Sequence, residues 1–204
     1  MTDTCIRRLT GRAMTPFLED LARLRIAVFR EWPYLYDGDM DYEKTYLETY
    51  SRSPDSLFVL AFGGDRVIGA STGVPMVDET DDFKRPFEKQ GYDPQRIFYF
   101  GESVLLPEYR GCGLGVRFFA ERETFARALD RFDWTCFCAV ERPANHPRRP
   151  PEYVPLDSFW RRRGYEKHPE LTTTYTWKDL DEADQSPKPM TFWLKALATA
   201  DAKT

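Results

Sequence analysis

A group of glycines follows an arginine in the stretch 107–119, PEYRGCGLGVRFF. Glycine destabilises helices because its backbone loses the most freedom on ordering, so its use directly before an amphipathic helix needs another reason. Without Cβ atoms at positions 111, 113 and 115, successive main-chain N–H groups can converge on an anion at the helix N-terminus. The helix dipole and the guanidinium of Arg110 would add positive charge. The stretch therefore predicts a site for a pyrophosphate.

Two familiar phosphate-binding loops do not fit these residues. A Walker loop ends in Gly-Lys-Ser/Thr, whereas Gly115 is followed by Val116 and Arg117. The dinucleotide fingerprint G-x-G-x-x-G requires a glycine where Val116 stands. What remains is Arg-x-x-Gly-x-Gly, carried by Arg110, Gly113 and Gly115. A tight turn between a strand and a helix is the alternative explanation, but one glycine would suffice for that.

The longer string LLPEYRGCGLG at 105–115 closely resembles motif A of the GNAT N-acetyltransferase superfamily. FWRRRGY at 159–165 is similar to the family's later Leu-Tyr-x-Lys-x-Gly-Phe segment, and the order of expected elements over about residues 4–197 matches the family's fold. The resemblance implies a single GNAT domain over residues 1–204. It implies a mixed α/β fold, whose central, mostly antiparallel sheet has one splayed parallel strand pair and is flanked by helices.

The resemblance also implies acetyl-CoA as the cosubstrate. The turn from Gly111 to Val116 would bind its pyrophosphate, and the strand before the turn would offer main-chain groups to the pantetheine arm. Such an opening between parallel strands usually requires a bulge in the fourth strand. Asn145 is a loose counterpart of an asparagine that the family places after its fifth strand. The implied cofactor-binding residues are Ser103, Val104, Leu105, Arg110, Gly111, Cys112, Gly113, Leu114, Gly115, Val116 and Asn145.

The family's reaction is a direct attack by an amine on the thioester, with both substrates held in one complex. An alkylamine of pKa about 10.4 is almost entirely protonated at pH 7, so a carboxylate acting directly or through a water is needed as general base. We expect Glu102, in the strand segment FYFGESVLL, to be this base, because its burial in a strand would otherwise be costly. The alternative is that Glu102 pairs with a buried arginine.

The thiolate that leaves also requires a proton. A tyrosine often supplies it in the family, but Trp160 stands at that position, and an indole N–H is far too weak an acid. Tyr153 is the candidate catalytic acid, with ordinary packing as the alternative role. A thiol with a pKa of about 8.5 could also take its proton from water.

The stretch WPYLYDGDMDYE at 32–43 combines aromatic and acidic side chains. In this fold, the segment between the first two helices commonly borders the acceptor pocket, and such a composition suits a cationic amine. The expected partner is therefore an amine acceptor, either a small molecule or a peptide. Alternatively, Asp39 or Asp41 caps the second helix and the tyrosines pack on the core. The predicted substrate-binding residues are Trp32, Tyr34, Tyr36 and Asp37.

Hydrophobic patterns predict the elements that position these residues. A strand over 96–106, the glycine turn, a helix and a strand over 133–140 form a right-handed parallel crossover. Gly63-Gly64-Asp65 joins two β-rich runs within 56–74 as a hairpin. The remaining expectations are a strand at 4–10, helices at 15–30 and 41–51, a short helix near 83–89, a long loop at 141–155, a short helix at 156–165, and a hairpin of 172–180 with 189–197.

Composition limits the other classes of function. The net charge of −4 argues against a nucleic-acid-coating protein, and no apolar run approaches the roughly 20 residues of a membrane helix. The four cysteines fit no zinc spacing, so we expect free thiols and no metal. The N-terminal stretch MTDTCIRRLTGR lacks the apolar core of a signal peptide, so we expect a cytoplasmic protein. A homodimer is left open, because the aromatic C-terminal hairpin could cover a neighbour's core.

Two other functions compete with acetyl transfer. A non-catalytic acyl-CoA-binding regulatory module would retain the glycine turn but tolerate loss of Glu102. A transferase for a longer acyl group would need a longer pocket beyond Val104. The acceptor itself does not follow from the fold.

Overall fold

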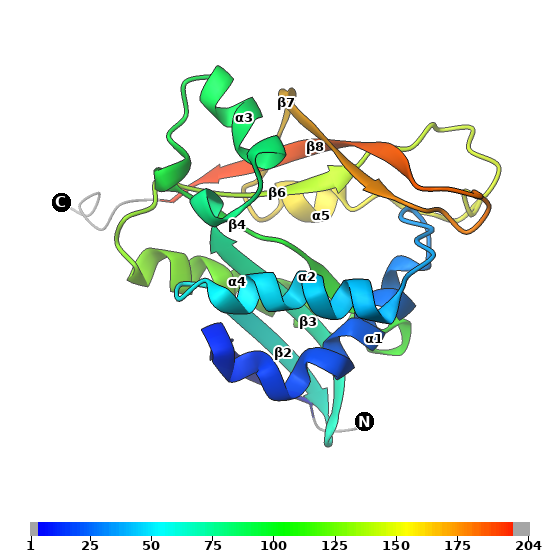
Figure 1. The fold of residues 1–204 in the computed structure, drawn as a ribbon, viewed down its shortest axis with the longest axis horizontal. Coiled ribbons are helices and arrows are strands. Elements are labelled where there is room, and N and C mark those ends of the chain that lie inside the picture. Colours follow the sequence, from blue (N-terminus) through cyan, green and yellow to red (C-terminus); the bar gives the residue numbers. More distant parts are fainter. Residues whose placement is uncertain (1–3, 198–204) are drawn as a thin grey trace.

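The computed structural model describes residues 4–197, whose strands form one mixed sheet (Figure 1). The strand order is β1-β2-β3-β4-β6-β8-β7, and β5 pairs with β3 beside β4. Among the described strands, only β4 and β6 run parallel to each other, so the parallel crossover predicted around the glycine turn is confirmed. The strands are β1 (Thr4–Thr10), β2 (Leu57–Gly63), β3 (Arg66–Pro75), β4 (Ile97–Tyr99), β5 (Ser103–Leu105), β6 (Trp134–Val140), β7 (Glu166–Trp177) and β8 (Ser186–Ala196).

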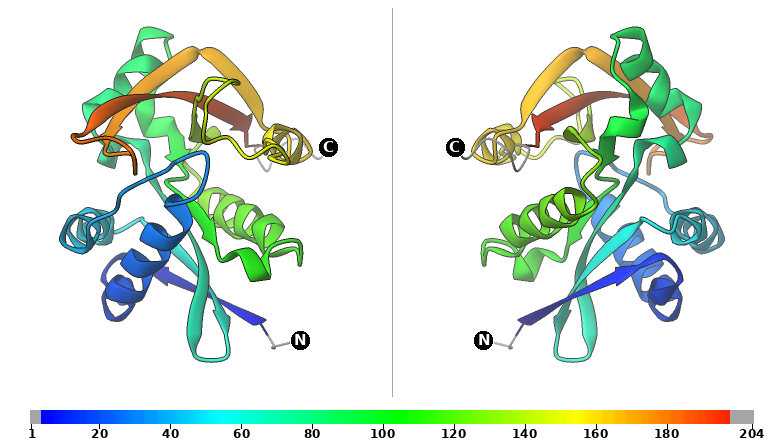
Figure 2. Two further views of the ribbon diagram at one scale, coloured as in Figure 1. Left: turned by 90° about the vertical axis from the view of Figure 1, so that its right-hand side faces the viewer. Right: turned by 90° about the vertical axis from the view of Figure 1, so that its left-hand side faces the viewer.

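Helices cover both faces of the sheet. Figure 2 shows α1 and α2 on one face and α4 and α5 on the opposite face. Burial on both sides explains why β2 is almost wholly apolar, LFVLAFG, rather than alternating. The helices are α1 (Leu18–Phe29), α2 (Met40–Arg52), α3 (Asp81–Lys89), α4 (Leu114–Ala128) and α5 (Asp157–Arg161).

The strand predicted over 96–106 is divided into two short strands. β4 pairs with β6 from Ile97 to Tyr99, and the N–H of Phe100 still donates to Cys136 O at 2.7 Å. Beyond that point β5 pairs only with β3 among the described strands, and β6 continues along β8. The two parallel strands therefore separate at residues 100–102, where the sequence led us to expect a bulge.

Proline explains the other differences from the predicted boundaries. Pro16 lies in a 3₁₀ segment, Gly11–Phe17, so regular α-helix starts only at Leu18. β7 begins at Glu166, earlier than predicted, because the pairing with β8 continues across a register shift between His168 and Thr172 that accommodates the intervening proline. The N-terminal strand, both hairpins and the helices near 41–51 and 83–89 are confirmed.

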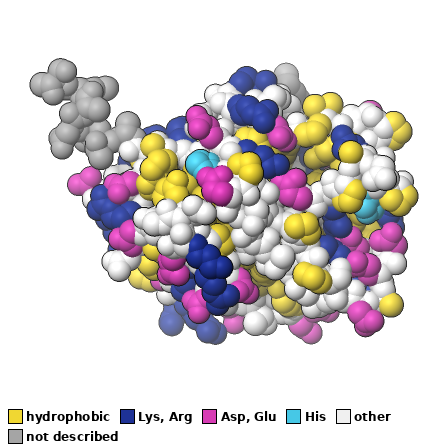
Figure 3. Space-filling model, turned by 90° about the horizontal axis from the view of Figure 1, so that it is seen from above, with side chains coloured by type: hydrophobic (Ala, Val, Ile, Leu, Met, Phe, Trp, Pro, Cys, Tyr) yellow, Lys and Arg dark blue, Asp and Glu magenta, His cyan; other side chains and the backbone are white. Residues whose placement is uncertain are grey.

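The surface above α3 and the C-terminal hairpin carries charges of both signs. Figure 3 shows Lys and Arg interspersed with Asp and Glu, with hydrophobic side chains between them. No helix within residues 4–197 is both long and apolar enough to cross a bilayer. The same residues contain no group of three or more His, Cys, Asp or Glu arranged to hold a metal ion.

Candidate active site

The glycine turn presents main-chain N–H groups at the start of α4. Gly111 and Gly113 have φ of +80° and +88°, and Gly113 is the N-cap residue. The N–H groups of Val116 and Arg117 donate to Gly113 O, whereas those of residues 111–115 have no acceptor within the described chain. A Cβ at Gly111 or Gly113 would meet nothing within 4 Å, so these glycines are needed for their left-handed backbone. Free N–H groups at a helix N-terminus are suited to an anion.

Arg110 fastens the turn to neighbouring elements. Its Nε donates to Leu105 O at 3.1 Å, and its Nη2 lies 2.8 Å from Glu31 Oε2. Cys112 is exposed, and its thiol donates to Tyr109 O at 2.8 Å. Glu31 offsets part of the Arg110 charge, and the main-chain N–H groups of residues 111–115 are the unpaired donors of the turn.

One edge of β5 faces the opening between the parallel strands. Residues Ser103–Leu105 pair with the segment 69–71 of β3 on the other edge, and Val104 is fully buried. The Ser103 hydroxyl accepts a hydrogen bond from Arg122 Nη2 at 2.8 Å. An extended ligand could therefore add alongside β5 and use the main-chain groups of its free edge.

Arg122 of α4 holds the point at which β4 and β5 separate. Its buried guanidinium donates from Nη1 to Glu102 O at 3.1 Å and to Thr72 O at 3.3 Å. It also lies over the Phe100 ring, 4.2 Å from the centroid. Burial lowers the pKa of Arg122 to about 10, which leaves it charged at neutral pH. Sequence analysis missed this residue, although its position four residues after the buried Phe118 was a signal.

Glu102 lies in the break between β4 and β5, with its side chain 2% exposed. Arg25 Nη1 of α1 lies 2.6 Å from Glu102 Oε2, and the same guanidinium donates from Nε to Glu43 of α2. Burial raises the pKa of Glu102; the charge of Arg25 opposes this rise and that of Glu43 adds to it. The pairing with a buried arginine, our alternative for Glu102, is therefore present.

The ion pair neutralises the Glu102 carboxylate only in part. Arg25 Nη1 contacts Oε2 at 2.6 Å, and hydrogen bonds from the Arg25 and Thr72 side chains oppose the rise in the pKa of Glu102 that burial causes. Two carboxylates share one guanidinium, so the cluster has one excess negative charge when both are ionised. Such a group can receive a proton from a neighbouring amine.

An aromatic cavity of about 90 Å³ opens in front of this cluster. Typical ligand sites are about 300–1,000 Å³, so this cavity can hold only the reacting end of a large substrate. Tyr34 and Tyr36, two of the predicted acceptor residues, line it. The lining residues are Arg25, Phe29, Tyr34, Tyr36, Tyr42, Glu43, Tyr46, Phe83, Tyr99, Gly101, Glu102, Cys138, Tyr175, Trp177 and Met190.

The other predicted acceptor residues lie outside the cavity lining. The Trp32 ring packs 4.9 Å from that of His146, and Asp37 Oδ2 pairs with Lys178 Nζ at 3.0 Å. Asp39 caps α2, because its Oδ1 accepts a hydrogen bond from the N–H of Tyr42 at 2.8 Å. The helix cap that we considered for this segment is thus present together with a tyrosine-lined cavity.

The candidate acid and the loose asparagine match lie in the loop before α5. Tyr153 is half-buried with its ring against Trp32 at 5.9 Å, and it is not among the cavity residues. Burial raises the pKa of Tyr153, with Asp157 adding to the rise. Asn145 is exposed, and Trp160 packs on Trp193 at 5.0 Å.

Sequence analysis did not find Arg25, and it named Glu43 only as part of an acidic stretch. Arg25 lies four residues after Leu21 on the buried face of α1, and Glu43 lies four residues before Leu47 on the buried face of α2. A charged residue at a core position of a helix is an available signal, because such a charge needs a partner. The partners themselves come from separate elements.

No family model matches the sequence, and no curated protein matches it. Solved structures do resemble this one. A ribosomal-protein-alanine N-acetyltransferase of Brucella melitensis is 17% identical with a TM-score of 0.61, over 95% of this chain and 99% of that chain. An acetyltransferase of Streptococcus agalactiae is 18% identical with a TM-score of 0.60, over 97% of this chain and 100% of that chain.

A third similar structure is NAA60 of Arabidopsis thaliana in complex with a bisubstrate analogue. It is 10% identical with a TM-score of 0.62, over 96% of this chain and 100% of that chain. Identities this low carry information about the backbone and not about the substrate. The parallel β4–β6 pair, the free edge of β5 and the glycine turn before α4 agree with the same assignment. The fold of this chain is that of the GNAT acetyltransferases.

Proposed function

We propose that this chain is an acetyl-CoA-dependent N-acetyltransferase that acts on a primary amine of a small molecule, peptide or protein. The observation that carries the proposal is the place of Glu102. Its carboxylate lines the aromatic cavity at the break between β4, which pairs with β6, and β5, which does not. A base at this place would lie where the proposed acceptor cavity meets the opening for an extended cosubstrate.

The residues present fit acetyl-CoA. The unpaired N–H groups of residues 111–115 would bind the pyrophosphate, helped by the charge of Arg110, and the free edge of β5 would bind the pantetheine arm. When bound, acetyl-CoA supplies an acetyl group activated as a thioester. Leu114 is buried and fixes the turn on the core, while Cys112 and Val116 of the turn are exposed. Asn145, on the loop after β6, is also exposed.

Glu102 would accept the proton of the attacking amine. The amine nitrogen forms a bond to the acetyl carbon, the carbon–sulfur bond breaks, and the proton passes to Glu102 directly or through a water. Arg25 would hold the carboxylate in place, and Glu43 would keep the guanidinium from neutralising it fully. Water is the simplest proton source for the departing thiolate, and Tyr153 remains the candidate protein acid.

Replacing Glu102 by Gln tests the proposal. We expect kcat to fall about 10²- to 10⁴-fold, because the base is lost, while the Kd for acetyl-CoA stays within about twofold of the parent value. Thiol release measures kcat, and isothermal titration calorimetry measures binding. Glu108→Gln is the matched control, because Glu108 is exposed. An unchanged kcat for Glu102→Gln would remove this residue from the mechanism.

The same assays separate the competing functions. Binding of acetyl-CoA without thiol release for any amine would indicate a regulatory module. A higher kcat/KM with longer acyl-CoA species would indicate a different acyl group. Failure to bind coenzyme A at all would refute the role of the glycine turn.

A further inference from the structure

The segment between α1 and α2 is joined directly to the connection between β7 and β8. The N–H of Asp37 donates to Lys178 O at 2.9 Å, and the N–H of Leu180 donates to Leu35 O at 2.8 Å. Tyr36 forms an antiparallel bridge with Asp179 between these two bonds. Together they make a short ribbon, residues 35–37 with 178–180, along one wall of the cavity.

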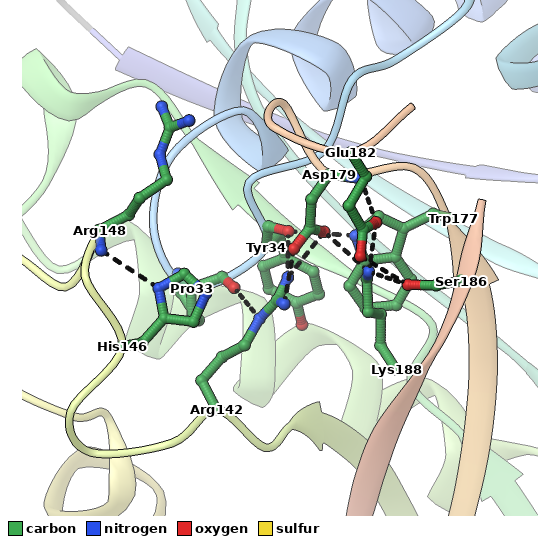
Figure 4. Close-up of polar contacts among 10 residues, drawn as sticks. All are labelled: Pro33, Tyr34, Arg142, His146, Arg148, Trp177, Asp179, Glu182, Ser186 and Lys188. Carbon is green, nitrogen blue, oxygen red and sulfur yellow. Dashed lines mark hydrogen bonds and ion pairs between the residues drawn. The ribbon is translucent and has the colours of Figure 1, made fainter. Parts of the chain in front are cut away.

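A group of charged side chains from different parts of the chain secures this ribbon, as Figure 4 shows. Arg142, just after β6, pairs with both oxygens of Asp179 at 2.7 and 2.9 Å. Its guanidinium also donates to Pro33 O at 2.8 Å and to Tyr34 O at 2.6 Å. Bidentate pairing with further hydrogen bonds fixes geometry more strongly than a single contact. Arg142 therefore joins β6, the ribbon and the cavity residue Tyr34.

Lys188 of β8 completes the network from the other side. Its ammonium lies 2.6 Å from Glu182 Oε2 and 3.5 Å from Asp179 Oδ1, with its side chain only 5% exposed. The indole N–H of Trp177 donates to Tyr34 O at 3.1 Å. These contacts lie on the side of Tyr34 and Trp177 away from the cavity, and they fix the position of this aromatic wall. Opening the ribbon would leave buried charges without their partners.

Contacts continue along β7 before the ribbon. The Tyr175 hydroxyl lies 2.7 Å from that of Tyr42 in α2, and its ring packs on Phe83 of α3 at 5.9 Å. The hydroxyl of Thr173 donates to Asp82 O at 2.8 Å. Residues 173, 175 and 177–180 thus contact, in order along the chain, α3, α2 and the α1–α2 segment. An extended polypeptide crossing the cavity would need a strip of open surface along this line.

The chemistry inside the cavity selects a cation. Glu43 and Glu102 share the single charge of Arg25, which leaves an excess of negative charge. Aromatic rings make up most of the remaining wall, and their faces attract ammonium groups. The cavity of about 90 Å³ has room for an ammonium on a short apolar group, but not for the flanking residues of a peptide.

We propose that the acceptor is a compact amine, with one ammonium on a short alkyl or arylalkyl group, and that the ribbon secured by Arg142 excludes polypeptides. This inference rests on the proposed acetyltransferase function and narrows its substrate class. It makes Arg142 a positioning residue for specificity, because it acts through Tyr34 and Asp179 and is not a cavity residue.

The unmodified protein provides the first test. Thiol release from acetyl-CoA is measured with propylamine and 2-phenylethylamine, and with hexapeptides that offer either a free N-terminus or a central lysine. We expect kcat/KM to be at least about 100-fold higher for one of the small amines than for any peptide. If a peptide gave a kcat/KM as high as that of the small amines, the inference would be overturned, but the proposed acetyl transfer would stand. No thiol release with any acceptor would overturn both.

Arg142→Gln provides the second test. Releasing the ribbon should raise the ratio of peptide to small-amine kcat/KM at least about tenfold, which a general loss of activity would not do. Lys167→Gln is the control, because it removes an exposed pair with Glu141 at the far end of the same hairpin. An unchanged ratio in a variant that still unfolds cooperatively would contradict the role of Arg142. If that variant does not fold, the comparison of acceptors on the unmodified protein still decides the inference.

Discussion

Arg25 is the residue on which the chemistry of the site depends most at short range. It lies between two carboxylates and beneath aromatic rings, with its guanidinium 4.4 Å from the Tyr46 centroid. A single arginine can hold Glu102 in place without fully cancelling its charge, because Glu43 competes for the same guanidinium. The raised pKa of Glu102 follows from burial first and from the charge of Glu43 as well. Ion pairing and proton acceptance are therefore compatible in one residue.

Replacing either of two neighbouring glycines by alanine should change the free energy of unfolding, but in opposite directions. Gly113 has a φ of +88°, so Gly113→Ala should lower the free energy of unfolding by about 1–2 kcal/mol. Gly115 is helical, and a Cβ there would meet only the Phe159 ring at 3.4 Å, so Gly115→Ala should raise stability by up to about 1 kcal/mol. Urea unfolding without ligand measures both. If both substitutions changed the free energy of unfolding in the same direction, the left-handed conformation of Gly113 would be contradicted.

At the scale of elements, α4 does more than supply an N-terminus. Its buried Arg122 donates to Thr72 O on β3 and to Glu102 O in the break before β5, and Glu102 O also accepts from the N–H of Thr72 at 3.1 Å. The guanidinium thus supplements the hydrogen bonds between β3 and the break, and it helps to fix the direction in which β5 diverges from β6. The helix that would bind a phosphate and the strand that would bind a pantetheine arm are coupled through this one side chain.

Arg122→Met should break this coupling. The change removes the donor to the buried Thr72 O, whereas Glu102 O still accepts from the N–H of Thr72 and the exposed Ser103 hydroxyl can turn to solvent. One buried acceptor left without a donor costs about 1–3 kcal/mol, so we expect the free energy of unfolding to fall by about that amount. The affinity for coenzyme A should fall as well, measured by calorimetry. The exposed Arg117→Met, on the same helix, should change stability by less than about 0.5 kcal/mol. Equal effects of the two changes would refute the role of Arg122.

At the scale of the whole molecule, the C-terminal hairpin contacts the segment between α1 and α2 through the Tyr36–Asp179 bridge and the Asp37–Lys178 ion pair, and charged side chains also stabilise the hairpin itself. Glu182, in the connection between β7 and β8, accepts hydrogen bonds from Lys188 and Ser186 and from the N–H of Asp179. The hydrogen bond from Lys188 is the main reason that the pKa of Glu182 is lowered to about 2. Ionised Glu182 therefore favours the folded hairpin.

This shift predicts a pH dependence of stability. Because the folded pKa lies below the ordinary value of 4.5, the stabilisation is complete above pH 4.5 and is lost as pH falls toward about 2. In Glu182→Gln, the unfolding free energy should therefore fall less steeply than in the parent protein across this window. Chemical unfolding at a series of pH values measures the slopes. Identical slopes in Glu182→Gln and in the parent protein would contradict the assignment.

The sequence by itself determined the elements and the glycine turn. Local patterns were sufficient for β1, the β2–β3 hairpin, α2 and the parallel crossover, because apolar periodicity and turn residues act over short distances. The string LLPEYRGCGLG likewise indicated the fold, since it requires left-handed glycines at 111 and 113, which the structure has. Glu102 was notable as a charge within an apolar strand.

Only the tertiary structure decided what surrounds these features. Arg25, Glu43 and Glu102 come from α1, α2 and the break after β4. Their spacing in the sequence does not predict that the three side chains are in contact. The break itself depends on Arg122, and the closed side of the cavity depends on Arg142 and Asp179, which are separated by 37 positions in the chain. Secondary structure follows from neighbours along the chain, whereas a buried charge finds its partners only when distant elements pack together.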